Sequence, residues 1–202
     1  AQLFRSVNAD PNPKGQGIVE YACDDFFPKQ SFSSREQKFE PGSYGITEQP
    51  FKMTVDDNVR FSVTIFPTLK TSNPQSLIEF GKFCLTLDPS GHVSFSFGSK
   101  AITTVDTISF RRWHRIEAQI NKTGLMSIEF VNLDNSKGSK PASIQFDLDL
   151  DLNEQAHVII AAKRVGGSAK NCFNGKIEHP EICADGQIVA FWDFYENIPS
   201  LA

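Results

Sequence analysis

Three aspartates alternate with leucines in the segment Phe146-Asp147-Leu148-Asp149-Leu150-Asp151-Leu152. On a β-strand this alternation places the carboxylates of Asp147, Asp149 and Asp151 on one face, about 6.6 Å apart. Oxygen ligands of this kind suit Ca²⁺, a hard cation. Neighbouring carboxylates on one strand are too far apart to share an ion without help from loops, so a strand whose polar face lies in water is the favoured interpretation. Ca²⁺ stays open as a ligand, and we expect no other cofactor in this domain.

The densest basic and aromatic cluster of the sequence is Arg111-Arg112-Trp113-His114-Arg115. An indole ring flanked by guanidinium groups could stack on a sugar ring or pair with an acidic partner. We therefore name Arg112, Trp113 and His114 as candidate ligand-binding residues. The alternative is that Trp113 anchors the core at the start of a strand while the arginines are solvated, and a core position is also favoured for Trp192.

Motifs of the common enzyme classes are absent from the chain. It lacks a Gly-x-Ser-x-Gly elbow, a His-Glu-x-x-His zinc motif and a phosphate-binding Gly-x-x-x-x-Gly-Lys-Ser/Thr loop. Its four histidines lie far apart in the sequence, without the spacing of metal ligands. No catalytic residue is predicted.

Composition and charge narrow the range of partners. The 202 residues contain 20 Lys and Arg against 24 Asp and Glu, which gives a net charge of −4. The basic residues are scattered, so nucleic acid is not expected as a partner. The longest apolar run, residues 157–162, ends at Lys163 and is too short to cross a bilayer. We therefore expect neither a nucleic-acid nor a membrane partner.

Four cysteines at irregular spacings do not form a disulfide framework. Most lie in apolar segments, where a free thiol behaves as a small hydrophobe. Cys172 and Cys183 flank a predicted hairpin, and they are the one pair for which a disulfide merits a test.

Apolar residues alternate with polar ones in short segments from about residue 55 to 195, as half-buried strands require. No segment of 12 or more residues has a convincing helical period. Strands with one apolar face need a second sheet to cover that face. The sequence predicts an all-β, two-sheet antiparallel sandwich. The expected strands are 59–67, 76–80, 83–87, 92–97, 113–120, 126–131, 143–152, 157–163, 173–182 and 188–194.

The N-terminal region has a different character. Residues 1–54 are more polar and loop-like, with one candidate strand at 18–23. We expect them to form an extension packed on the sandwich of residues 55–202, within one structural domain. An edge strand in this extension would protect a sheet edge from aggregation.

Two segments resemble motifs of laminin-G-like domains, which belong to the concanavalin A-like lectin and glucanase superfamily. Trp113-His114-Arg115-Ile116 resembles the Trp-His motif of these domains. Phe173-Asn-Gly-Lys-Ile177, followed by Pro180-Glu-Ile182, resembles a strand near their end, and Ile188–Phe194 resembles the final strand. The resemblance covers about residues 55–195 and implies a jelly-roll sandwich.

Further motifs, which include the N-terminal extension, resemble the laminin-G-like region in the large subunit of N,N-dimethylformamidase-like amidohydrolases. That resemblance implies that the chain is an accessory module of a longer polypeptide, whose C–N hydrolysis belongs to another domain, and it favours the cytoplasm. It supplies no catalytic residue for these positions. The motifs are Asp10-Pro-Asn-Pro-x-Gly-x-Gly, Gln37-x-x-x-Pro-Gly-Ser43-Tyr44, Phe66-Pro-Thr68 and Asn174-Gly-Lys-Ile-Glu178-x-Pro.

Three functions follow as hypotheses. The first is a non-catalytic module for binding or assembly, whose partner is a catalytic domain of the same or a neighbouring chain. The second is a self-contained carbohydrate-binding domain of the lectin type. The third is a glycoside hydrolase of the glucanase type, which would need two carboxylates about 5–5.5 Å apart in a retaining enzyme. The sequence shows no such pair on one strand, so we expect no activity.

Overall fold

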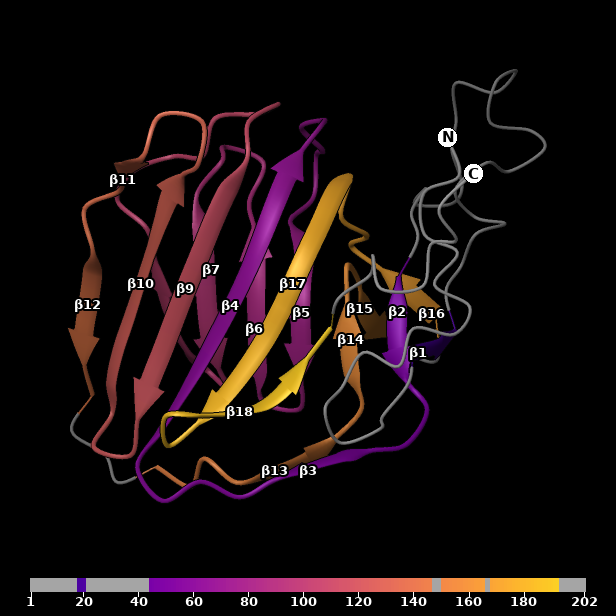
Figure 1. Ribbon diagram of the computed structural model, residues 1–202, viewed down its shortest axis with the longest axis vertical. Coiled ribbons are helices and arrows are strands. Elements are labelled where there is room, and N and C mark those ends of the chain that lie inside the picture. Colours follow the sequence, from indigo (N-terminus) through magenta and orange to yellow (C-terminus); the bar gives the residue numbers. More distant parts are fainter. Residues whose placement is uncertain (1–17, 21–43, 147–149, 166–167, 193–202) are drawn as a thin grey trace, which may run out of the picture.

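Two antiparallel sheets pack face to face around one apolar layer (Figure 1). Residues along their strands are alternately buried in this layer and turned away from it. The computed structural model describes residues 18–20, 44–146, 150–165 and 168–192. The chain is all-β, as predicted, and its described part contains no helix that could span a membrane. We call the two layers the front sheet and the back sheet, after their places in Figure 1.

The front sheet has the strand order β11-β10-β9-β4-β17-β18, and β12 also pairs with β10. Its central strand β4 turns a uniformly apolar face to the core, formed by the buried residues Val59, Phe61, Val63 and Ile65. The strands are β4 (Asn58–Pro67), β9 (His114–Asn121), β10 (Leu125–Asn132), β11 (Lys137–Gly138), β12 (Ala142–Gln145), β17 (Gly175–Ala184) and β18 (Gln187–Phe191).

The back sheet has the order β1-β2-β14-β5-β6-β7-β8. Its strands are β1 (Ile18–Glu20), β2 (Gly45–Thr47), β14 (Val158–Ile160), β5 (Gln75–Phe80), β6 (Phe83–Leu87), β7 (Val93–Phe97) and β8 (Lys100–Thr103). Two short pairs complete the description: β3 (Phe51–Met53) with β13 (Glu154–Ala156), and β15 (Lys163–Val165) with β16 (Ser168–Lys170).

Phenylalanine rings join the two sheets. Phe61 of the front sheet lies 5.2 Å from Phe83 and 5.6 Å from Phe95 of the back sheet, measured between ring centroids. Trp192 is fully buried, which confirms its predicted core position. The many phenylalanines of the sequence therefore serve chiefly as core.

Strands within the predicted N-terminal extension pair with the sandwich. β2 pairs with β14, and β3 pairs with β13. β1, at the predicted strand position, pairs with β2 and forms an edge of the back sheet. The division of the chain at residue 54 stays a prediction.

The expected strand over 143–152 is wrong in its second half. β12 ends at Gln145, and residues 150–153 belong to no strand, while Asp147 and Asp149 lie outside the described residues. Side-chain hydrogen bonds hold the loop instead: Asn153 donates from its backbone N–H and from Nδ2 to Asp151 Oδ1, at 3.1 and 2.8 Å. Asn153 Oδ1 in turn accepts the N–H of Val55 at 2.9 Å.

The predicted hairpin between Cys172 and Cys183 is also wrong. β17 is one continuous strand from Gly175 to Ala184, and both cysteines are free thiols. At about 3.3 Å per strand residue, their α-carbons are separated by far more than the roughly 7 Å limit for a disulfide. Cys172 packs in a small cluster with Ile46 and Ile159, whereas Cys183 is buried with its Sγ beside Arg60 of β4.

Candidate functional site

The outward-facing side chains of the front sheet form the candidate site, which we call the outer face. In β4 the inward residues alternate with Arg60, Ser62, Thr64 and Phe66, and the antiparallel register aligns these with outward residues of β9 and β17. No described segment lies over this face (Figure 1). Its central residues are Arg60, Ser62, Thr64, Phe66, Arg115, Glu117, Gln119, Lys176, Glu178, Glu181 and Cys183.

An aromatic pair lies at one end of the outer face. The rings of Phe66 and Trp113 are 5.3 Å apart between centroids, tilted by 55°, and both residues are half-buried. Lys176 Nζ lies 5.9 Å from the centroid of the Phe66 ring. The backbone carbonyl of Trp113 accepts the N–H of Leu133 at 2.8 Å, which holds the start of β9 against the end of β10. The pair is an apolar platform beside a cation.

The structure separates the three residues that the sequence grouped as ligand contacts. Trp113 lies with Phe66, whereas the His114 imidazole faces the core and is 1% exposed. His114 Nε2 donates to the carbonyl of Ser109 at 2.9 Å, and its Nδ1 is buried without a partner among the described residues. Burial lowers the pKa of His114, so the neutral ring is favoured. Arg112 is exposed, with its Nε 3.6 Å from Asp134 Oδ2.

Ion pairs cross the middle of the outer face. Arg60 Nη2 lies 2.9 Å from Glu181 Oε1, and its Nη1 lies 4.0 Å from Glu117 Oε2. Arg115 Nε donates to Glu117 Oε1 at 2.9 Å. Arg60 Nη2 also lies 3.1 Å from Cys183 Sγ, and this contact is the main cause that raises the pKa of Arg60. Each carboxylate is thereby oriented across neighbouring strands.

Of the three aspartates considered as Ca²⁺ ligands, the structure describes Asp151, while Asp147 and Asp149 lie outside the described residues, so Ca²⁺ binding by this segment stays a prediction. Asp151 is exposed, and hydrogen bonds from Asn153 lower the pKa of its carboxyl group. The residues that the structure describes contain no group of three His, Cys, Asp or Glu side chains that could hold a metal ion.

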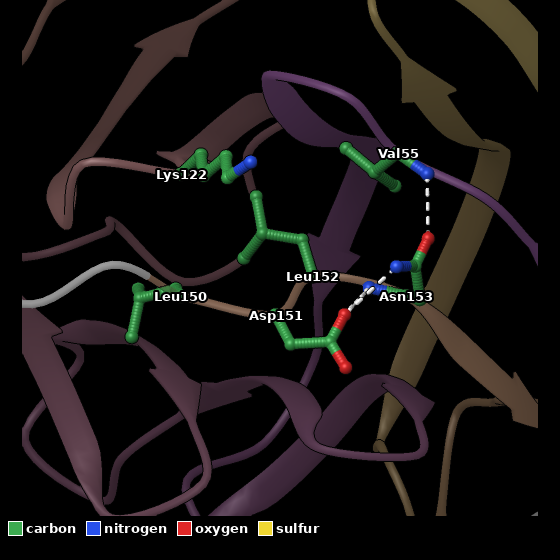
Figure 2. Close-up of a pocket in the computed structure, with 6 residues that line it drawn as sticks. All are labelled: Val55, Lys122, Leu150, Asp151, Leu152 and Asn153. Carbon is green, nitrogen blue, oxygen red and sulfur yellow. Dashed lines mark hydrogen bonds between the residues drawn. The ribbon is translucent and has the colours of Figure 1, made fainter.

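A pocket of about 240 Å³ lies beside Asp151 (Figure 2). It lies at the end of the sandwich opposite the aromatic pair, because its lining residue Lys122 follows the end of β9, whereas Trp113 precedes the start of that strand. Its lining combines apolar and polar side chains, and one residue among them, Asp151, carries a carboxylate. Figure 2 shows that this carboxylate is turned toward Asn153. The lining residues are Val55, Lys122, Leu150, Asp151, Leu152 and Asn153.

Sequence reasoning did not select Phe66, Arg60, Glu117 or Glu181 as site residues. The signal was present in part, because alternation in residues 59–67 places Arg60 on the polar face of a strand. The register between β4, β9 and β17 was needed to bring these side chains together. Strand pairing over more than a hundred residues of sequence cannot be obtained from periodicity alone.

Comparison with known proteins identifies the fold. No family model and no curated protein matches the sequence. Among solved structures, the LG1–3 region of the laminin α2 chain superposes with a TM-score of 0.53 at 18% identity, over 72% of this chain and 31% of that one. The fold is a laminin-G-like jelly roll.

Two other similar structures come from bacterial and phage proteins. A putative carbohydrate-binding protein from Bacteroides ovatus has a TM-score of 0.54 at 11% identity, over 74% of this chain and 48% of that one. The enzymatically active domain of bacteriophage CBA120 tailspike protein 2 has a TM-score of 0.53 at 8% identity, over 91% and 31%. The chain thus spans less than half of each of these proteins, and at such identities the likeness concerns the fold alone.

Proposed function

We propose that this chain is a carbohydrate-binding module whose outer face receives the sugar. The observation that carries the proposal is the half-buried pair of Phe66 and Trp113 on a sheet face that no described segment covers. The likeness to a putative carbohydrate-binding protein from Bacteroides ovatus supports it at the level of the fold.

The chemistry of the outer face suits a pyranose ring. The C–H face of a sugar is apolar and packs on an aromatic ring, while its hydroxyls need planar donors and acceptors. Arg115 of β9 follows Trp113 by two residues on the same face, and Glu117 follows Arg115 by two more. They provide these groups and are held by their mutual hydrogen bond of 2.9 Å. Because the carboxylates are already oriented by arginines, little side-chain entropy is lost when a sugar binds.

The test begins with a glycan array, followed by calorimetric titration of the strongest oligosaccharide. Trp113→Ala should lower the affinity at least about tenfold, equivalent to about 1.4 kcal/mol, because it removes the stacking surface. Leu125→Ala is the matched control, since Leu125 is 39% exposed at the far end of β10. An array without binders, or equal affinities for Trp113→Ala and the unsubstituted chain, would refute the proposal.

A chelator decides whether Ca²⁺ takes part. On the outer face Glu117 and Glu181 are paired with arginines, so we expect EDTA to leave oligosaccharide affinity unchanged. Loss of binding in EDTA, restored by Ca²⁺, would instead favour the aspartates at 147, 149 and 151 as ligands.

The relationship to amidohydrolases remains a proposal that rests on sequence motifs. If the chain is an accessory module of an N,N-dimethylformamidase-like enzyme of the cytoplasm, the encoding reading frame should continue into a catalytic domain. In that case the neighbouring domain is a second candidate partner. A pull-down between the separately expressed parts tests this, and a reading frame without a catalytic domain would refute it.

A further inference from the structure

Three segments meet at the end of the sandwich that holds the aromatic pair, and we call them the loop end: residues 68–74, 104–113 and 133–141. The Arg111 N–H donates to the Pro67 carbonyl at 2.8 Å, and the Lys140 N–H donates to Asp106 Oδ2 at 2.9 Å. The Leu133 N–H donates to the Trp113 carbonyl at 2.8 Å. Figure 1 shows β4 and β10 both pointing toward this end.

The loop end is positively charged, although the whole chain carries a net charge of −4. Its three segments carry five cations and two carboxylates. Asp106 Oδ2 accepts the Lys140 N–H, and Asp134 lies beside Arg112. The cations are Lys70, Arg111, Arg112, Lys137 and Lys140.

Each of the three segments also exposes one aliphatic side chain. Leu69 is 50% exposed, Val105 67% and Leu133 47%. Lys70 Nζ lies 5.4 Å from the centroid of the Phe110 ring, so charge and apolar surface are interleaved here. Single exposed aliphatic side chains are ordinary on a protein surface. Here three of them lie on adjoining segments among five cations, so this surface is both apolar and basic.

The opposite end of the sandwich carries the opposite charge. Its described turns carry Asp56, Asp57, Asp151 and Asp185 beside Lys122, and the apolar residues Val55 and Leu152 are buried there. The molecule is therefore polarised in charge along its strands, and the basic end is the one that exposes Leu69, Val105 and Leu133.

We propose that the loop end docks on the surface of a bilayer that contains anionic lipids. Lipid headgroups attract the cations, and aliphatic tips enter the boundary between headgroups and acyl chains. A flat bilayer can contact all three segments at once. The sequence predicts no membrane partner because it lacks a run of spanning length, but surface docking needs no such run.

The test is co-sedimentation with phosphatidylcholine vesicles, with and without one third phosphatidylserine, at low and high salt. We expect binding to the anionic vesicles only, weakened by salt. Lys70→Gln with Lys140→Gln should lower the partition constant about 25-fold, since one cation near such a surface contributes about fivefold. Lys82→Gln with Lys122→Gln is the control at the opposite end and should leave binding unchanged.

The aliphatic tips provide an independent readout. Leu69→Ser with Val105→Ser should lower the partition constant at least about fivefold at constant charge. Unchanged binding by this variant would overturn the proposal in favour of general adhesion to polyanions. Retention on polygalacturonate without vesicle binding would overturn it in favour of an acidic polysaccharide. All of these variants should keep the oligosaccharide affinity that depends on Trp113, so the two proposals can fail separately.

Discussion

His114 shows at the scale of one residue how a candidate ligand contact became a core residue. Its ring is buried, packs edge-on against Phe130 at 5.6 Å, and donates to the Ser109 carbonyl. The Trp-His pair thus contributes one side chain to the outer face and one to the core, because neighbouring strand positions point in opposite directions. Sequence alone could identify the alternation but not which member faces outward.

Protonation of His114 should destabilise the fold. Burial lowers the pKa of His114 below the ordinary 6.5. The unfolded chain therefore binds this proton more readily, and the free energy of unfolding should fall as the pH drops from 6.5 toward the folded-state pKa. Chemical denaturation across this range measures the slope. His114→Gln should lower stability overall but flatten the slope, and an equal slope in both proteins would contradict the assignment.

Glu79 on β5 has the opposite pH dependence. Burial raises the pKa of Glu79 above the ordinary 4.5, although Lys163 and the Arg164 N–H act against this shift, and its Oε2 is buried without a partner among the described residues. The unfolded carboxyl ionises first, so stability should fall as the pH rises from 4.5 through the folded-state pKa.

Glu79→Gln should therefore raise the melting temperature at neutral pH, with the gain disappearing as the pH falls to 4.5. Melting curves of the variant and the unsubstituted chain at matched pH values check this. A gain that is independent of pH would mean that packing rather than ionisation is responsible.

At the scale of the element, the close packing around Gly175 explains why the Phe-x-Gly-x-Ile segment needs glycine at this position. Gly175 begins β17 opposite Pro67 of β4. A Cβ at this position would clash with the backbone carbonyl of Phe66 and lie 2.7 Å from the Phe173 ring. The glycine therefore lets β17 approach the strand that carries the aromatic platform.

Gly175→Ala should lower the free energy of unfolding by about 1–3 kcal/mol, the usual cost of overpacking. Urea denaturation measures the loss, and Lys176→Ala, at the exposed neighbouring position, is the control. Stability equal to that of the control would show that β17 can shift without cost. Because Phe66 lies beside Gly175, we also expect weaker oligosaccharide binding by the glycine variant.

The segment 146–152 shows where strand prediction failed. Its alternation of acidic and apolar residues is typical of a strand. In the structure, however, the Asp151 carboxylate accepts the Asn153 N–H, and the Asn153 side chain accepts the Val55 N–H. Leu150 is half-buried against the core and Leu152 is buried. Short polar side chains that form hydrogen bonds with the nearby backbone compete with sheet formation. The alternation of apolar and polar residues carries no information about these hydrogen bonds, so it predicted a strand.

At the scale of the whole molecule, alternation along the chain was enough to predict two antiparallel sheets. It could not predict which sheet face stays uncovered, because that depends on the pairing of β4 with β9 and β17, which are distant in sequence. The short strands β2, β3 and β8 were missed for a related reason. They contain three or four residues, too few for a period, and their partners hold them in place.

The most direct test of the outer face uses the fluorescence of Trp113. The chain has two tryptophans, of which Trp192 is fully buried, so Trp192→Phe leaves Trp113 as the sole indole reporter. Titration of this variant with the oligosaccharide selected on the array should give a saturable change in emission, with the same dissociation constant as calorimetry. Binding by calorimetry without any change in Trp113 emission would place the sugar elsewhere and contradict the account.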